Sequence, residues 1–185
     1  SGTLGAGALA LAWAEVLGRH EGLRTTFSRD EQGLAQIVHP GPLEALVVLN
    51  YSESTRDGRT CDQQFVMRAD GRDLHRISDG RGKTTCGWFL PGSDRLLFAS
   101  STAHDDACPA KPDPSKGYVW PLDRYDIYTV SRDGGPMTRL TNYDVYTAEA
   151  VLSPDGKRIV FTSLKDGDLD IYTMNVDGTD VRRLT

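Results

Sequence analysis

The last fifteen residues have the pattern of a β-hairpin: Ile171-Tyr-Thr-Met-Asn-Val-Asp-Gly-Thr-Asp-Val-Arg-Arg-Leu-Thr185. Apolar and polar residues alternate, the Asp-Gly pair tolerates positive φ at a tight turn, and the final residues can return as a partner strand. The pattern occurs twice more, as Ile127-Tyr-Thr-Val-Ser-Arg-Asp-Gly-Gly-Pro-Met-Thr-Arg-Leu-Thr141 and as Gln64-Phe-Val-Met-Arg-Ala-Asp-Gly-Arg-Asp-Leu-His-Arg-Ile-Ser78. The sequence therefore predicts a repeat array.

The spacing of the copies gives the size of the repeating unit. The turn residues Asp70 and Asp133 are 63 positions apart, and Asp133 and Asp177 are 44 apart. Pro91 and Pro154 are also separated by 63 positions, so one register relates the two copies throughout. The unit is about 44 residues long, with about 19 residues inserted in the middle copy. This period is typical of four-stranded propeller blades.

The third copy carries a family resemblance. Ser153-Pro-Asp-Gly-Lys-Arg-Ile-Val-Phe-Thr-Ser163, then Asp170-Ile-Tyr-Thr-Met-Asn175 and Arg183-Leu-Thr185, is similar to the blade repeat of TolB-type β-propellers. The resemblance covers about Glu53 to Thr185 in three copies. It implies a mainly β fold and a ring of six blades. Because the family is mostly bacterial and exported, it also implies a periplasmic or secreted protein.

The repeats divide the chain into expected domains. We expect three antiparallel four-stranded blades at 34–78, 79–141 and 142–185, which form an incomplete ring. The inner pair of the first blade is predicted at Leu34–His39 and Leu46–Ser52. Residues 1–33 are predicted to hold one helix, over 1–22, followed by a strand.

The N-terminal segment has a second resemblance. Within residues 11–40, Arg19-His-Glu-Gly-Leu-Arg-Thr-Thr-Phe27 resembles the start of a nonribosomal peptide synthetase condensation domain. The catalytic His-His-x-x-x-Asp-Gly motif of that family is absent, since none of the four histidines is adjacent to another. No condensation activity is predicted, and the two resemblances suggest a chimera or a fragment. Leu9, Trp13 and Leu17 lie on one face of the expected helix, which could cap the first blade.

Composition limits the classes of function. The net charge is −5 without a run of like charges, which favours a solvated surface over a nucleic-acid interface. No stretch is apolar for 18 residues, so no membrane span is predicted. The apolar segment 6–17 contains Glu15 and has no preceding Lys or Arg, so we predict no signal peptide in this chain.

Three cysteines lack the close pairing of zinc ligands, so no metal is predicted. Strand order places Cys61, Cys86 and Cys108 at the same end of the blades. A structural disulfide, buried free thiols, or a catalytic cysteine with His104 are the alternatives, and the disulfide is favoured. Because Cys86 and Cys108 belong to the second blade, we expect them to pair and leave Cys61 free.

The insertion of the middle copy, residues 102–124, is the candidate binding segment. It is proline-rich and contains aromatic residues, and long loops on a rigid scaffold often carry binding. The alternative is that it only covers the edge of the blade. The residues that we expect to contact a partner are His104, Asp105, Tyr118, Trp120 and Arg124.

The sequence favours a non-catalytic binding or scaffold module that presents loops to a protein, peptide or glycan. It has no Gly-x-Ser-x-Gly elbow and no phosphate-binding glycine loop, so neither enzyme activity nor a cofactor is predicted. The alternatives are a condensation-domain fragment fused to repeats, or the accessory propeller of a secreted hydrolase. Because three blades cannot close a ring, we expect self-association through the open end.

Overall fold

The computed structural model describes most of the chain after residue 45 and parts of the segment before it. The described residues are 12, 15–16, 19–20, 25–30, 33–38, 46–54, 60–68, 72–110, 112–113, 115, 117 and 120–185. The chain forms two compact units. One comprises Ser1–Val47 and Val66–His75, and the other comprises Val48–Phe65 and Arg76–Thr185.

The described part of the chain is mainly β, as predicted. A first hairpin pairs β1 (Thr25–Asp30) with β2 (Gly33–Val38). A three-stranded sheet has the order β3 (Leu46–Ser54), β4 (Thr60–Arg68), β5 (His75–Arg76). A four-stranded sheet follows, with β6 (Trp88–Phe89), β7 (Arg95–Ser100), β8 (Asp126–Ser131) and β9 (Thr138–Arg139). The last sheet has β10 (Thr147–Leu152), β11 (Arg158–Ser163), β12 (Asp170–Asn175) and β13 (Arg182–Arg183).

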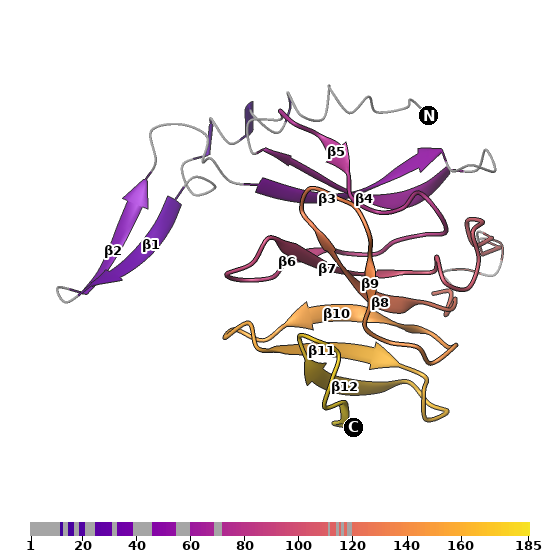
Figure 1. The fold of residues 1–185 in the computed structure, drawn as a ribbon. Coiled ribbons are helices and arrows are strands. Elements are labelled where there is room, and N and C mark those ends of the chain that lie inside the picture. Colours follow the sequence, from indigo (N-terminus) through magenta and orange to yellow (C-terminus); the bar gives the residue numbers. More distant parts are fainter. Residues whose placement is uncertain are drawn as a thin grey trace. The chain divides into compact units, whose positions relative to one another are not determined.

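These three sheets are antiparallel meanders in sequence order, which is the connectivity of propeller blades (Figure 1). The expected incomplete set of blades is confirmed. The pairing of one strand was predicted wrongly: residues 34–39 were expected to pair with Leu46–Ser52. Instead β2 pairs with β1, with Thr25 opposite Val38 and Asp30 opposite Gly33. Only two residues separate these strands, and such a short connection favours local pairing over a partner beyond Pro40 and Pro42.

The expected N-terminal helix falls almost entirely outside the described residues. Residues 12, 15, 16 and 19 have helical backbone, and the N–H of His20 donates to the carbonyl of Val16 at 3.0 Å. Leu9, Trp13 and Leu17, the residues of the predicted cap, are not among the described residues.

Both four-stranded sheets are fastened by the same polar contact between their last two strands. In the middle sheet the Thr141 hydroxyl donates to Asp126 and accepts the backbone N–H of Ile127, both at 2.9 Å. In the last sheet the Ile171 N–H donates to the Thr185 hydroxyl at 2.9 Å, while Arg183 donates to Asp170. The repeated Asp and Thr positions therefore build the blade itself.

An apolar core joins the two four-stranded sheets, which lie side by side in Figure 1. It contains Leu97 and Ile127 from the middle sheet with Ile159, Phe161 and Tyr172 from the last, all at most 1% exposed. The turn of the last hairpin also packs on the middle sheet. Gly178 has a φ of +86°, and a Cβ built there would be 3.0 Å from the carbonyl oxygen of Leu140. Only glycine fits both the turn and this approach.

Candidate functional site

The insertion between β7 and β8 is tied back toward the preceding segment of the chain. The N–H of Gly82 donates to the carbonyl of Asp106 at 2.8 Å, and the Arg81 guanidinium contacts the Asp106 carboxylate at 2.9 Å. The N–H of Thr84 in turn donates to the carbonyl of Asp62. The insertion, the segment before β6 and the start of β4 therefore meet in one place.

This arrangement corrects the expected disulfide. The bond joins Cys61 to Cys108, with their Cα atoms 5.6 Å apart, and Cys86 is a free, exposed thiol. The prediction that Cys86 pairs with Cys108 is wrong because it assumed that the insertion contacts only its own blade. The contacts of residues 81–84 show that it folds back to the start of β4 instead.

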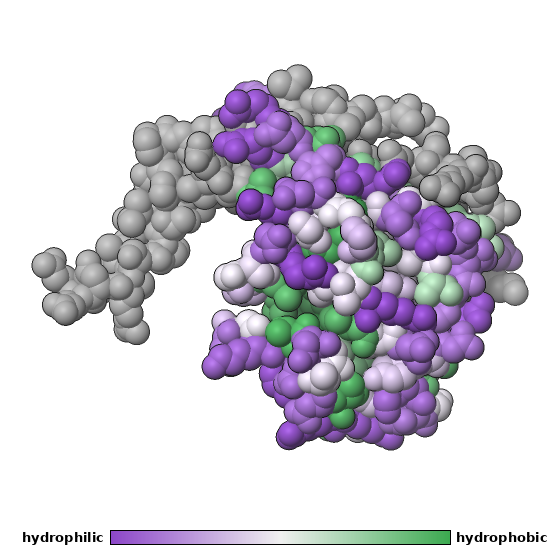
Figure 2. Space-filling view, in the orientation of Figure 1, coloured by the Kyte–Doolittle hydropathy of each residue, from purple (hydrophilic) through white to green (hydrophobic). Residues whose placement is uncertain are grey.

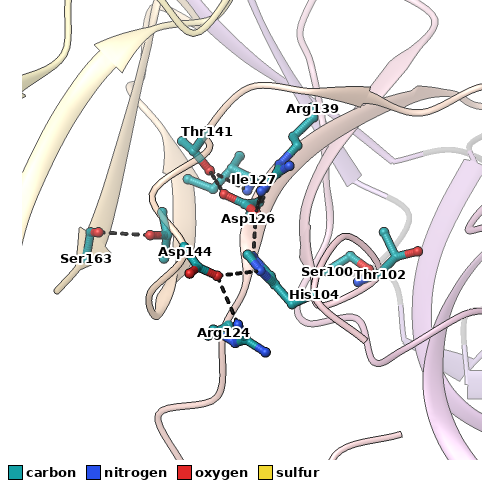
Figure 3. A network of polar contacts seen from close by, with 11 residues as sticks. Ser100, Thr102, His104, Arg124, Asp126, Ile127, Arg139, Thr141, Asp144 and Ser163 are labelled. Atoms are coloured by element: carbon teal, nitrogen blue, oxygen red, sulfur yellow. Dashed lines mark hydrogen bonds and ion pairs between the residues drawn. The ribbon is translucent and has the colours of Figure 1, made fainter. Parts of the chain in front are cut away.

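His104 is buried within the insertion and holds it against β8 (Figure 3). Its Nε2 lies 2.7 Å from Asp126, and its Nδ1 lies 3.3 Å from Asp144. Its side chain is 6% exposed, and Arg124 contacts Asp144 at 3.0 Å from the solvent side. Both ring nitrogens thus face carboxylates, and His104 fastens the insertion to the blade rather than facing a ligand.

The other expected contact residues differ in where they lie. The Asp105 carboxylate accepts the N–H of Ala107 at 2.8 Å and so shapes the turn after His104. Trp120 is 56% exposed and lines a pocket. Tyr118 lies outside the described residues. Of the four expected residues that the structure describes, Trp120 alone lines this pocket.

The pocket lies in the unit that contains the two four-stranded sheets and has a volume of about 380 Å³. This size is within the range of small-molecule and side-chain sites. Its described lining combines three aromatic rings, two carboxylates, one ammonium group, two prolines and several hydroxyl groups. The lining residues are Asn50, Asp62, Lys83, Thr84, Thr85, Cys86, Pro112, Trp120, Pro121, Tyr125, Tyr146 and Glu149.

Most of this lining was missed from the sequence, although the repeat register contains the signal. Three pairs of lining residues are 63 positions apart: Asp62 with Tyr125, Lys83 with Tyr146, and Cys86 with Glu149. Positions that are equivalent in successive repeats lie at the same end of their blades, so they gather around one opening. The cysteines were expected at one end of the blades. Cys86 lines this pocket together with Asp62, the neighbour of Cys61.

A chain of hydrogen bonds orders the aromatic wall of the pocket. The indole N–H of Trp120 donates to the Tyr146 hydroxyl at 3.3 Å, and that hydroxyl donates to Glu149 at 2.8 Å. Tyr125 packs edge to face on Tyr146, with their ring centroids 6.1 Å apart. The wall is therefore held by packing and hydrogen bonds from several elements.

Burial raises the pKa of Tyr146 to about 12, and the contact with Glu149 acts in the same direction. The pKa of Tyr125 is also raised, first by burial and then by negative charges that include Asp123, Asp62 and Glu149. Both hydroxyls therefore stay neutral at physiological pH and act as hydrogen-bonding groups. Across the described ranges, no three side chains of His, Cys, Asp or Glu gather as metal ligands would.

Comparisons with known proteins agree with the fold. No family model matches the chain. It is 39% identical over 132 residues to an uncharacterized protein of Agrobacterium fabrum, a match over 68% of this chain and 44% of the relative. The chain thus spans less than half of that relative's length.

Solved structures with similar folds are propellers at low identity. A TolB-like protein of Agrobacterium tumefaciens has a TM-score of 0.53 at 18% identity, covering 87% of this chain and 60% of its own. TolB of Acinetobacter baumannii has a TM-score of 0.54 at 16% identity, and the match covers 89% of this chain and 41% of TolB. A chain of the nidogen/laminin complex has a TM-score of 0.50 at 14% identity, and the match covers 86% of this chain and 56% of that one. These similarities support a TolB-like propeller fold, while the resemblance to condensation domains stays a prediction. No helix in the described segments is long and apolar enough to cross a membrane.

Proposed function

We propose that this chain is a binding module whose pocket receives a peptide segment of a protein partner. The observation that carries the proposal is the half-exposed indole of Trp120 at the mouth of a preformed pocket of about 380 Å³. Exposed tryptophans beside such pockets are common energetic anchors of protein interfaces. The disulfide between Cys61 and Cys108 pins the insertion that carries Trp120, which lowers the entropy lost on binding.

We propose further that binding occurs without catalysis. His104 is the group of the insertion best suited to acid–base chemistry, yet it is buried with both nitrogens at carboxylates. The proposal includes a periplasmic or secreted location, which is supported by the disulfide and by the resemblance to TolB-type repeats.

Peptide selection from a displayed random library tests the proposal. We expect peptides that bind the 185-residue chain and lose at least ten-fold in affinity with Trp120→Ala. Trp88→Ala is the matched control, because Trp88 is 47% exposed but does not line the pocket. Bound peptide recovered with unchanged mass is the result expected of a non-catalytic site.

Two outcomes would overturn the proposal. Selected peptides that bind the Trp120 and Trp88 variants equally would place binding elsewhere. Oligosaccharides that bind in a Trp120-dependent way, where no peptide does, would replace the peptide with a glycan partner.

A further inference from the structure

One residue of the pocket is held in a strained backbone conformation. Glu149 has a φ of 55°, a region that non-glycine residues seldom occupy outside Asn and Asp. It lies at a β-bulge, since Ala148 pairs with Thr162 but Val151 pairs with Val160, so two residues of β10 oppose one residue of β11. Bulges of this kind redirect a side chain, and such strain often marks a functional position.

The bulge brings the Glu149 carboxylate to the pocket, where no described residue supplies a counter-charge. The carboxylate accepts a hydrogen bond from the neutral hydroxyl of Tyr146 at 2.8 Å, and it forms no ion pair with any cation in the described part of the chain. The ammonium group of Lys83 is instead 3.9 Å from the other carboxylate of the lining, Asp62. The described lining therefore has two carboxylates and one ammonium group. Because Lys83 pairs with Asp62, the uncompensated negative charge is that of Glu149.

The surroundings of Glu149 suit an organic cation. Trp120 offers a half-exposed indole, and Tyr146 connects that ring to Glu149 through two hydrogen bonds. A cation gains from the face of an aromatic ring and from a nearby carboxylate at the same time, and tryptophan is the strongest of these rings. The raised pKa of Tyr125, which Asp123, Asp62 and Glu149 increase beyond the effect of burial, is consistent with a negative potential here.

We propose that the pocket selects the ammonium or guanidinium group of a basic peptide side chain, held between the Trp120 ring and the Glu149 carboxylate. This inference rests on the proposed peptide-binding function and names the chemistry of the ligand. The bulge positions the counter-charge, the tryptophan supplies the apolar and π-electron surface, and Lys83 stays engaged with Asp62.

Two small probes test the preference directly. Nα-acetyl-L-lysine amide carries the ammonium group, whereas Nα-acetyl-L-norleucine amide has a similar apolar chain without it. The readout is the indole N–H resonance of Trp120 in a heteronuclear NMR spectrum, assigned by its loss in Trp120→Phe. We expect at least ten-fold tighter binding of the lysine probe, and weaker binding as salt rises.

Charge-matched variants separate a local effect from net charge. Glu149→Gln keeps an acceptor for the Tyr146 hydroxyl and should lose at least ten-fold in affinity for the lysine probe. Asp168→Asn removes one charge at an exposed turn, where it caps the N–H of Leu169, and should bind as the unmodified chain does. Equal titrations by the two probes, or equal losses in the two variants, would overturn the inference.

The two proposals can fail separately. Peptides that require Trp120 but show no enrichment in Lys or Arg would leave the peptide-binding function standing and remove the cation. A lysine probe that binds at Trp120, while no library peptide does, would retain the cation preference and remove the peptide partner.

Discussion

The two four-stranded sheets are near copies of each other, and they differ at the insertion that lines the pocket. Asp126 and Thr141 in the middle sheet match Asp170 and Thr185 in the last, and both pairs fasten the outer strands. The connection after the second strand differs. It is a short turn between β11 and β12, but between β7 and β8 it is the disulfide-bonded insertion that carries Trp120. Positions with the same residue type in both sheets build the scaffold, whereas the pocket combines the insertion with repeat-equivalent positions whose residue types differ.

The same two sheets differ in how much apolar surface they leave open. Ile127 in β8 is fully buried against the last sheet, whereas its repeat equivalent Ile171 in β12 is 43% exposed. Leu184 and Val151 are also exposed on the last sheet, at 59% and 41%. Figure 2 shows apolar side chains, in green, exposed among polar ones on this unit. A position that is core in one blade is surface in the next, so no described segment covers these residues of the last sheet.

The largest expected effect comes from the tie that only the middle sheet has. Replacing Cys61 and Cys108 by Ser frees a loop of 47 residues, which should cost about 4 kcal/mol of unfolding free energy through the entropy of the unfolded chain. Urea unfolding measures it. Cys86→Ser is the control and should leave stability unchanged, and a control that unfolds as easily as the double variant would contradict the assigned pairing.

The burial contrast predicts unequal responses at equivalent isoleucines. Ile127→Ala should cost about 3 kcal/mol because it leaves a cavity between the two sheets, and Ile171→Ala less than about 1 kcal/mol. Chemical denaturation of both variants provides the comparison. If the open face causes self-association, Ile171→Asp should lower the mass seen by light scattering. Equal destabilisation would mean that β12 is covered as β8 is.

The shared fastening predicts a smaller difference between the equivalent aspartates. Asp126→Ala should cost about 2 kcal/mol, because it leaves His104 and Thr141 without their charged partner. Asp170→Ala should cost about half as much, since Arg183 and Thr185 are exposed and water replaces the carboxylate. Thermal unfolding of the pair checks this, and an inverted order would refute the role assigned to His104.

The smallest expected effect concerns the strained residue of β10. Glu149→Gly should stabilise the fold by up to about 1 kcal/mol, because glycine occupies positive φ without strain. The same change should abolish the preference for the lysine probe. Unfolding and NMR titration of one sample measure both, and a destabilised variant would argue against strain at this position.

The sequence predicted the scaffold well because the repeat is explicit in it. The spacing of 63 and 44 residues located the last two sheets, and the strand ends at Ser163 and Asn175 follow the predicted pattern. The pairing within the first hairpin was missed because a short connection competes with a distant partner for the strand at residues 33–38, and periodicity does not decide between them.

The site was harder to predict than the fold. Trp120 was identified from its residue type and its place in a long insertion. Glu149 was not, because an isolated glutamate in a strand has no local signature, and the bulge that turns it depends on pairing with β11. The cysteine pairing failed for a similar reason, since the path of the insertion is set by tertiary contacts such as that between Gly82 and Asp106.

The central claim is that Trp120 and Glu149, rather than the open face of the last sheet, form the ligand site. Isothermal titration of one library-selected peptide against the unmodified chain, Trp120→Ala and Ile171→Ala tests it most directly. We predict that the Trp120 variant loses at least ten-fold in affinity and that the Ile171 variant binds unchanged. A loss confined to the Ile171 variant would place the ligand on the last sheet and contradict the account.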